Sequence, residues 1–214
     1  IVQEVIKGFL LTAIRWGTFH GDVYAGNLLL LPDGKVGVID WGIVGRLDPD
    51  THQFFRTLIH AALGDDDAWP EIARHAIRMY GPILEENLGM DEAQTEVFMR
   101  MALEPLLTLP FGEVSLADLL TAPQRQVAEV KGLEETQLTL RAIYTRFKEQ
   151  RRIRAAAEAH GVYDSDFDRG IFLLSKQLMY FERYGKIFLA DVGLFEDEEF
   201  FRAALEAPTT ASRT

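Results

Sequence analysis

The stretch HGDVYAGNLLLLPDGKVGVIDWG, residues 20–42, decides the fold of this chain, because it predicts a β-ribbon within a sequence that otherwise reads as helical. Two short apolar segments, residues 28–31 and 36–39, flank the tetrapeptide PDGK. Asp-Gly between apolar segments is a strong signal for a hairpin turn. The sequence therefore predicts two antiparallel strands joined by a tight turn.

The polar residues at the open end of this ribbon indicate a metal site. If Leu31 pairs with Val36, the same register places Asn27 directly opposite Asp40. Residues that face each other in this way have Cβ atoms about 4.5–5.5 Å apart. An amide oxygen and a carboxylate at that spacing suit magnesium, which keeps several waters and takes its other ligands from substrate phosphates. We therefore expect Asn27 and Asp40 to be magnesium ligands.

Asp22 lies five residues before Asn27, on the loop that enters the ribbon. Phosphoryl transfer needs one carboxylate that accepts a proton from the attacking hydroxyl, and separate oxygens that hold the metal. The order Asp-x4-Asn, hairpin, Asp-aromatic-Gly is that of the kinase catalytic and metal-binding loops. The pattern predicts Asp22 as the catalytic residue that accepts this proton. Taken singly, Asp22 could instead cap a turn, Asn27 could end a strand, and Asp40 could belong to an ordinary loop.

Residues 17–51, GTFHGDVYAGNLLLLPDGKVGVIDWGIVGRLDPDT, resemble the UbiB/AarF-type atypical kinases, most specifically over residues 18–50. The segment QLMYFERYGKIFLADVGLF, residues 177–195, resembles the C-terminal helices of that family. The resemblance implies a protein-kinase-like fold, binding of adenine nucleotide with magnesium, and a link to isoprenoid-quinone or lipid metabolism.

The same resemblance assigns roles within the loop. It makes Asp22 the loop aspartate, and His20 a residue that braces the backbone. Gly26 and Gly42 are expected to support the loop together with His20. Three residues, Val23 to Ala25, replace the family's usual Pro-His-Pro, and Trp41 replaces its usual phenylalanine.

Two other functions remain open. The motifs HGD and IDWG are also typical of aminoglycoside and choline phosphotransferases, which share the superfold, and a cluster of carboxylates facing Asp22 would favour that reading. The other function is that of a non-catalytic pseudokinase or interaction module. We prefer the UbiB-like reading, because GRLDPDT and YFERYGK fit it better.

The elements that a kinase N-lobe supplies are not found before Ile1, which already lies in a helical pattern. We expect the chain to be the C-lobe part of a longer protein, with the N-lobe as its partner. Alone, it is expected to fold but to be catalytically silent, because positioning of the nucleotide phosphates would be incomplete.

The rest of the chain predicts a mainly α fold (α+β). The expected organisation is a kinase-like C-lobe whose catalytic half is residues 1–63, a helical remainder and extension over residues 64–205, and a disordered tail over residues 206–214. Apolar periodicity and capping residues predict helices at residues 1–17, 47–64, 65–81, 90–107, 132–161 and 166–189. Residues 108–124 read as a loop, with one short helix at residues 116–120.

The composition narrows the possible partners. The net charge of −11 argues against a nucleic-acid surface, which would be basic. The absence of cysteine excludes disulfides and thiolate chemistry, and no apolar run is long enough to span a bilayer. A cytoplasmic protein is expected. The basic cluster at residues 146–154 reads as a solvated helix face, with peripheral contact to anionic lipid or to a partner as the alternative.

Overall fold

The computed structural model describes residues 1–81, 90–115 and 165–206. The helices in these ranges are α1 (Val2–Trp16), α2 (Pro49–Ala62), α3 (Ala68–Gly81), α4 (Glu92–Thr108), α8 (Ser165–Phe188) and α9 (Glu198–Glu206), with a 3-10 turn η1 (Ala25–Asn27). The strands are β1 (Thr18–His20), β2 (Leu28–Leu30), β3 (Val36–Val38) and β4 (Val44–Arg46). The predicted fold class, mainly α with a small β component, is confirmed.

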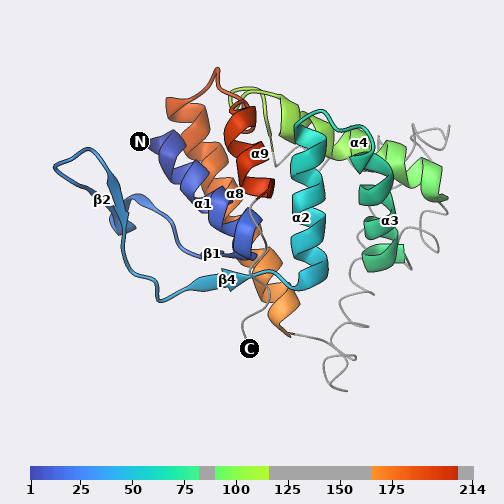
Figure 1. Cartoon of the computed structure of the whole chain (residues 1–214), viewed down its shortest axis with the longest axis horizontal. Coiled ribbons are helices and arrows are strands. Elements are labelled where there is room, and N and C mark those ends of the chain that lie inside the picture. Colours follow the sequence, from blue (N-terminus) through green and yellow to red (C-terminus); the bar gives the residue numbers. More distant parts are fainter. Residues whose placement is uncertain (82–89, 116–164, 207–214) are drawn as a thin grey trace, which may run out of the picture.

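Helix α1 forms the centre of the core. Its buried residues, Ile6, Phe9, Leu10, Ala13 and Ile14, recur at the three- and four-residue steps of an amphipathic helix. The helix ends at Gly17, whose left-handed backbone (φ 60°) suits a residue without a side chain. Helices α8 and α9 flank α1, and α2 closes the core beside them (Figure 1).

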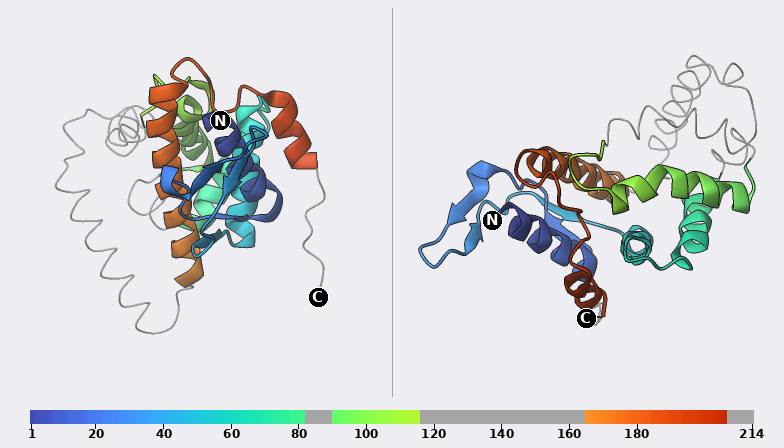
Figure 2. Two further views of the ribbon diagram at one scale, coloured as in Figure 1. Left: turned by 90° about the vertical axis from the view of Figure 1, so that its left-hand side faces the viewer. Right: turned by 90° about the horizontal axis from the view of Figure 1, so that it is seen from above.

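The β-ribbon and the α3–α4 pair lie at opposite ends of the molecule. Strands β2 and β3 project from one end, while α3 packs between α2 and α4 at the other (Figure 2). A second, smaller core lies there, around Trp69 and Ile72 of α3. The ribbon therefore lies far from the α3–α4 pair, and α1 and α8 are the helices next to its open end.

A second β pairing was not predicted. Strand β1 pairs antiparallel with β4, and the register joins Thr18 to Arg46 and His20 to Val44. Neither segment has the length or the alternation that identifies a strand from sequence. Because β1 precedes the ribbon and β4 follows it, their pairing ties together the two ends of residues 21–43.

Helix α8 packs along the core beside both β4 and α1. Near its start, Gly170 lies so close to β4 that a Cβ atom there would collide with the carbonyl oxygen of Arg46. Farther along, Phe181 meets Phe9 of α1 edge to face, with ring centroids 4.9 Å apart. Close backbone approach at one end and aromatic packing at the other therefore fix α8 against both β4 and α1.

Helix α9 was also not predicted. It is nine residues long and begins where Asp197 Oδ1 accepts the backbone N–H of Phe200. Phe201 and Ala204 are fully buried against the core. Lys7 of α1 holds its start through an ion pair of 2.6 Å to Asp197.

Helix α2 is capped by residues that lie next to it in the sequence. Asp48 is the N-cap, and its Oδ1 accepts the backbone N–H groups of Asp50 and Thr51, both at 3.1 Å. Pro49 occupies the first helical turn, where a missing N–H costs nothing. Gly64 follows the helix with φ 82°.

Replacing Asp48 with alanine is expected to lower the free energy of unfolding by about 1 kcal/mol, because two backbone N–H groups lose their acceptor. Asp48→Asn keeps a side-chain oxygen at the same place and serves as the control. Urea unfolding of the three proteins measures the difference. An unchanged midpoint for Asp48→Ala would mean that solvent satisfies those N–H groups equally well.

Several predicted features lie outside the described residues. These are the helices at residues 116–120 and 132–161, the basic cluster at residues 146–154, and residues 207–214 of the expected tail. Glu206 is the last residue of α9. Within residues 1–81, 90–115 and 165–206, no helix is both long enough and apolar enough to cross a membrane.

Candidate functional site

The predicted catalytic loop begins where β1 ends. The backbone N–H of Gly21 donates to the carbonyl of Ile43 at 2.8 Å, which extends the β1–β4 pairing by one bond. The loop then continues through Asp22 and Val23 to η1, which leads directly into β2. The residues around Asp22 and the segment around Asp40 are thereby held side by side, although 18 positions separate them.

His20 joins these two segments. It is only 3% exposed, and its Nδ1 accepts the backbone N–H of Asp22 at 3.1 Å. Its Nε2 lies 3.1 Å from the carbonyl oxygen of Ile39, so this nitrogen carries the proton in the neutral ring. The ring also meets Trp41 edge to face, at 4.7 Å between centroids. His20 therefore contacts the residues on both sides of Asp40.

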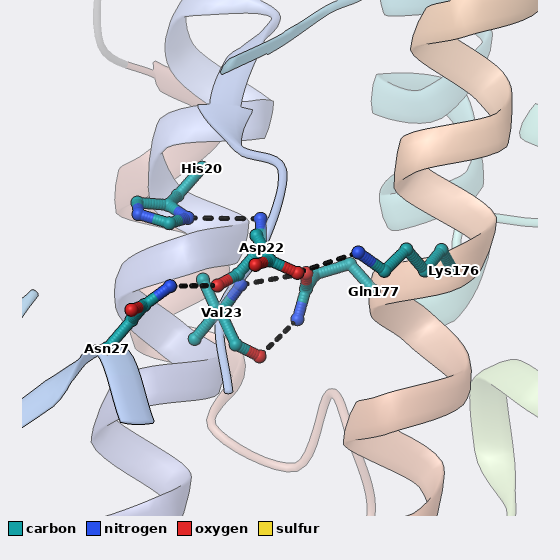
Figure 3. A network of polar contacts seen from close by, with 6 residues as sticks. All are labelled: His20, Asp22, Val23, Asn27, Lys176 and Gln177. Atoms are coloured by element: carbon teal, nitrogen blue, oxygen red, sulfur yellow. Dashed lines mark hydrogen bonds and ion pairs between the residues drawn. The ribbon is translucent and has the colours of Figure 1, made fainter. Parts of the chain in front are cut away.

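Asn27 also holds the backbone of Asp22, through the carbonyl group. Its Nδ2 donates to the backbone carbonyl of Asp22 at 3.0 Å, and the residue is 5% exposed (Figure 3). Because a carbonyl only accepts, the amide nitrogen must face it, and Oδ1 is left as the free acceptor of the side chain. Asp22 thus has both its backbone N–H and its carbonyl occupied, while its side chain stays 29% exposed.

The predicted register of the ribbon is wrong by one residue. Leu28 pairs with Val38 and Leu30 with Val36, and the N–H of Ile39 donates to the carbonyl of Asn27 at 2.9 Å. Asn27 therefore lies opposite Ile39 and not opposite Asp40. A one-residue change of register moves a side chain to the other face of a flat ribbon.

The hairpin turn between β2 and β3 explains why the observed register differs from the predicted one. The N–H of Gly34 donates to the carbonyl of Leu31, and the N–H of Leu31 donates to the carbonyl of Lys35, both at 2.9 Å. Gly34 has φ 81°. This is a three-residue hairpin loop with its glycine in the left-handed region, which closes with Leu31 opposite Lys35. The prediction had paired Leu31 with Val36.

Asp40 has an unusual backbone. Its φ is 59°, the only positive φ of a residue other than glycine within the described ranges. Such conformations are costly for most residues and concentrate at functional sites. The left-handed backbone turns the chain directly after the ribbon, and Asp40 Oδ1 accepts the N–H of Gly42 at 3.4 Å. Asp40 itself is exposed to solvent.

The chemical types of the donor groups at Asn27 and Asp40 suit a magnesium ion. Asn27 offers a neutral oxygen and Asp40 an exposed carboxylate, both from the open end of the ribbon. In the part of the chain that the structure describes, no three His, Asp or Glu side chains gather into a metal site. A cation here would need oxygens from water or from a phosphate. The assignment of Asn27 and Asp40 as ligands stays a prediction.

The two predicted glycines lie at close contacts. A Cβ atom at Gly26 would collide with the ring of Tyr24, and one at Gly42 would lie 3.2 Å from Asp40 Oδ1. Glycine at these two positions therefore lets the backbone pass close to the side chains of Tyr24 and Asp40.

Two residues of the site were missed by the sequence reasoning. Lys176 Nζ donates to Asp22 Oδ1 at 2.7 Å, and Gln177 binds the backbone of Val23 through both atoms of its amide. Both come from the middle of α8, 154 positions after the loop. In sequence they form an ordinary lysine-glutamine pair within a helix, and no local signal sets them apart.

A cavity of about 570 Å³ lies between α1 and the ribbon. Its lining includes Val5 and Phe9 of α1, Val36 and Val38 of the ribbon, and Trp41. Asp22, Asn27 and Asp40 are not part of this lining. The cavity still adjoins the site, because it is also lined by His20 and by Val23 and Trp41, the chain neighbours of Asp22 and Asp40.

Comparisons with known proteins agree with the resemblance expected from the sequence. Residues 1–72 match the family model of the ABC1 atypical kinase-like domain. An uncharacterized protein of Mycobacterium tuberculosis is 28% identical over 190 residues, which cover 86% of this chain and 31% of that protein. An uncharacterized aarF domain-containing protein kinase of Arabidopsis thaliana, described as chloroplastic, is 28% identical over 181 residues, or 85% of this chain and 31% of that protein.

The predicted resemblance to the AarF-type atypical kinases is thereby confirmed. The chain spans about a third of the length of these curated relatives. No solved structure matches it at a significant level.

Proposed function

We propose that this chain, whose first 72 residues match the ABC1 atypical kinase-like domain, carries the catalytic and metal-binding loops of a protein that transfers a phosphoryl group from ATP. The observation that supports this most is the hydrogen bonding of Asp22. His20 and Asn27 occupy its backbone N–H and carbonyl, and its carboxylate stays 29% exposed, with Oδ1 paired to Lys176. A rigid backbone beneath an accessible carboxylate is what a positioned base requires.

In the proposed reaction, the oxygen of an acceptor hydroxyl forms a bond to the γ-phosphorus of ATP. The bond from that phosphorus to the oxygen bridging the β- and γ-phosphates breaks, which leaves ADP. The hydroxyl proton passes to the carboxylate of Asp22. With water as the acceptor, the same steps are ATP hydrolysis.

Magnesium would be held by Asn27 Oδ1 and the Asp40 carboxylate, with its other ligands from water and phosphate oxygens. When bound, it supplies positive charge that offsets the charge of the phosphates. The lysine that cradles the phosphates and the loop that covers them belong to the N-lobe of a kinase fold, which we propose as the partner of this chain. The resemblance alone supports a link to isoprenoid-quinone or lipid metabolism.

The contacts of Asp22 bear on the alternative function, an aminoglycoside- or choline-type phosphotransferase. A phosphotransferase for cationic substrates would be expected to present carboxylates around Asp22, whereas among the residues that the structure describes the charged group in contact with it is the ammonium of Lys176. A cationic substrate would have to compete with that ammonium. The pseudokinase reading would be favoured if the full-length protein failed to bind magnesium-ATP.

The metal assignment predicts a specific loss of nucleotide binding. In the full-length protein, Asp40→Ala is expected to weaken magnesium-dependent ATP binding by about tenfold or more, because the cation loses a charged ligand. Asp33→Ala is the matched control, since Asp33 is an exposed aspartate at the far end of the same ribbon and pairs with Lys35. Calorimetry with and without magnesium measures the difference. Equal affinities for both variants would contradict Asp40 as a ligand.

A further inference from the structure

We infer that Lys176 of α8 is a phosphate-binding residue of this site, and that its ammonium bridges the Asp22 carboxylate and the phosphoryl group under transfer. This inference rests on the function proposed above and adds a residue that neither the motif nor the matched segment, residues 1–72, contains.

The first support is the way α8 holds the loop. Two consecutive residues of α8 bind two consecutive residues of the loop, Lys176 to Asp22 and Gln177 to Val23 (Figure 3). Gln177 is fully buried, and its Oε1 accepts the N–H of Val23 at 3.0 Å while its Nε2 donates to the carbonyl at 2.6 Å. These two bonds set the distance between helix and loop. The position of Lys176 beside Asp22 is therefore fixed by a buried neighbour.

The second support is the remaining donor capacity of Lys176. An ammonium has three protons, and one of them is used by Asp22 Oδ1 at 2.7 Å. The Nζ atom also lies 5.8 Å from the centre of the Tyr180 ring. The side chain is 30% exposed, so an oxyanion in the solvent can reach it without displacing Asp22.

The third support is the charge of the site. Asp22 and Asp40 are carboxylates, and by themselves they would repel a polyphosphate. Phosphoryl transfer depends on cations placed around the group that moves. In the part of the chain that the structure describes, Lys176 is the basic side chain that contacts a predicted catalytic or metal-binding residue. An ion pair this exposed contributes little to folding stability, so its effect should be seen in binding.

The test uses inorganic triphosphate with magnesium as the probe, titrated into the full-length protein by calorimetry. Lys176→Met is expected to bind the probe about tenfold more weakly, the loss of one charge-assisted hydrogen bond. Lys176→Arg keeps the positive charge and should retain most of the affinity. The turnover number for ATP hydrolysis should fall about 10²-fold in Lys176→Met.

Lys186→Met is the matched control. Lys186 is on the same helix and is also ion-paired, 2.6 Å from Glu182, but it lies ten residues farther along, about 15 Å by helical rise. It should bind the probe as the wild type does. Unfolding midpoints in urea should be the same for all of these proteins.

A double variant separates contact with phosphate from an effect exerted through Asp22. Asp22→Asn removes the carboxylate that repels the probe and shares the ammonium, so its affinity for triphosphate should rise. Adding Lys176→Met to Asp22→Asn should weaken triphosphate binding about tenfold relative to Asp22→Asn alone, because a direct contact with phosphate does not depend on the carboxylate. If Lys176→Met leaves the affinity of Asp22→Asn unchanged, or if Lys176→Met binds triphosphate as tightly as an active wild type, Lys176 does not contact the phosphate. A wild type that neither binds the probe nor hydrolyses ATP contradicts the proposed function, and this inference with it.

Discussion

Asp22→Asn in the full-length protein is expected to lower the turnover number for phosphoryl transfer by about 10²–10⁴-fold, because an amide cannot accept the proton of the attacking hydroxyl. The side chain keeps its shape. The backbone contacts of Asp22 with His20 and Asn27 do not involve the carboxylate and should persist. Steady-state assays of ATP hydrolysis at saturating magnesium-ATP measure the effect.

The fold should survive this change. Asp22 loses its ion pair with Lys176, but both side chains are about 30% exposed, and a pair in that setting contributes at most about 1 kcal/mol. Urea unfolding should therefore show a nearly unchanged midpoint. Asp33→Asn, at the exposed hairpin turn, is the control for the charge change. If Asp22→Asn turns over as fast as Asp33→Asn, the base must be another group.

Phe9→Ala is expected to have the largest effect on stability, a loss of about 3–5 kcal/mol. Phe9 is 5% exposed, and its ring meets Phe19 of β1 at 5.2 Å and Phe181 of α8 at 4.9 Å, both edge to face. Its removal leaves a cavity between three elements that neighbouring side chains cannot fill. Since small domains are stable by about 5–15 kcal/mol, the variant should unfold at much lower urea.

Phe188→Ala is the control for this prediction. It removes the same side chain from the end of α8, where Phe188 is 62% exposed, and should change the unfolding free energy by no more than about 0.5 kcal/mol. A loss below about 1 kcal/mol for Phe9→Ala would show that Phe9 is not central to the core.

The elements with strong local signals were predicted well. The apolar spacing in α1, the Asp48 cap of α2 and the capping box of α4, where Asp91 and Gln94 bond reciprocally, are all set by residues within one or two turns. The presence of the β2–β3 hairpin was predicted for the same reason. Its register was not, because one residue in the left-handed region decides it, and Asp-Gly is compatible with more than one loop length.

The features that were missed depend on distant residues. Strand β1 is three residues long and exists because β4 pairs with it from the far side of the ribbon. Helix α9 is short, and its burial against α1 stabilises it. Lys176 reaches Asp22 through the packing of α8, so the motif identifies Asp22 and only the fold identifies its partner.

The bond between Gln177 and Val23 also has a consequence for the order in which the nascent protein matures. The two residues are 154 positions apart. At a synthesis rate of about 5–20 residues per second, Gln177 leaves the ribosome roughly 8–30 s after Val23. Until then the backbone N–H and carbonyl of Val23 lack their partner from α8 and are open to water. The loop therefore acquires its final shape only after α8 has been synthesised, so a ribosome stalled before residue 165 would present an unfinished site.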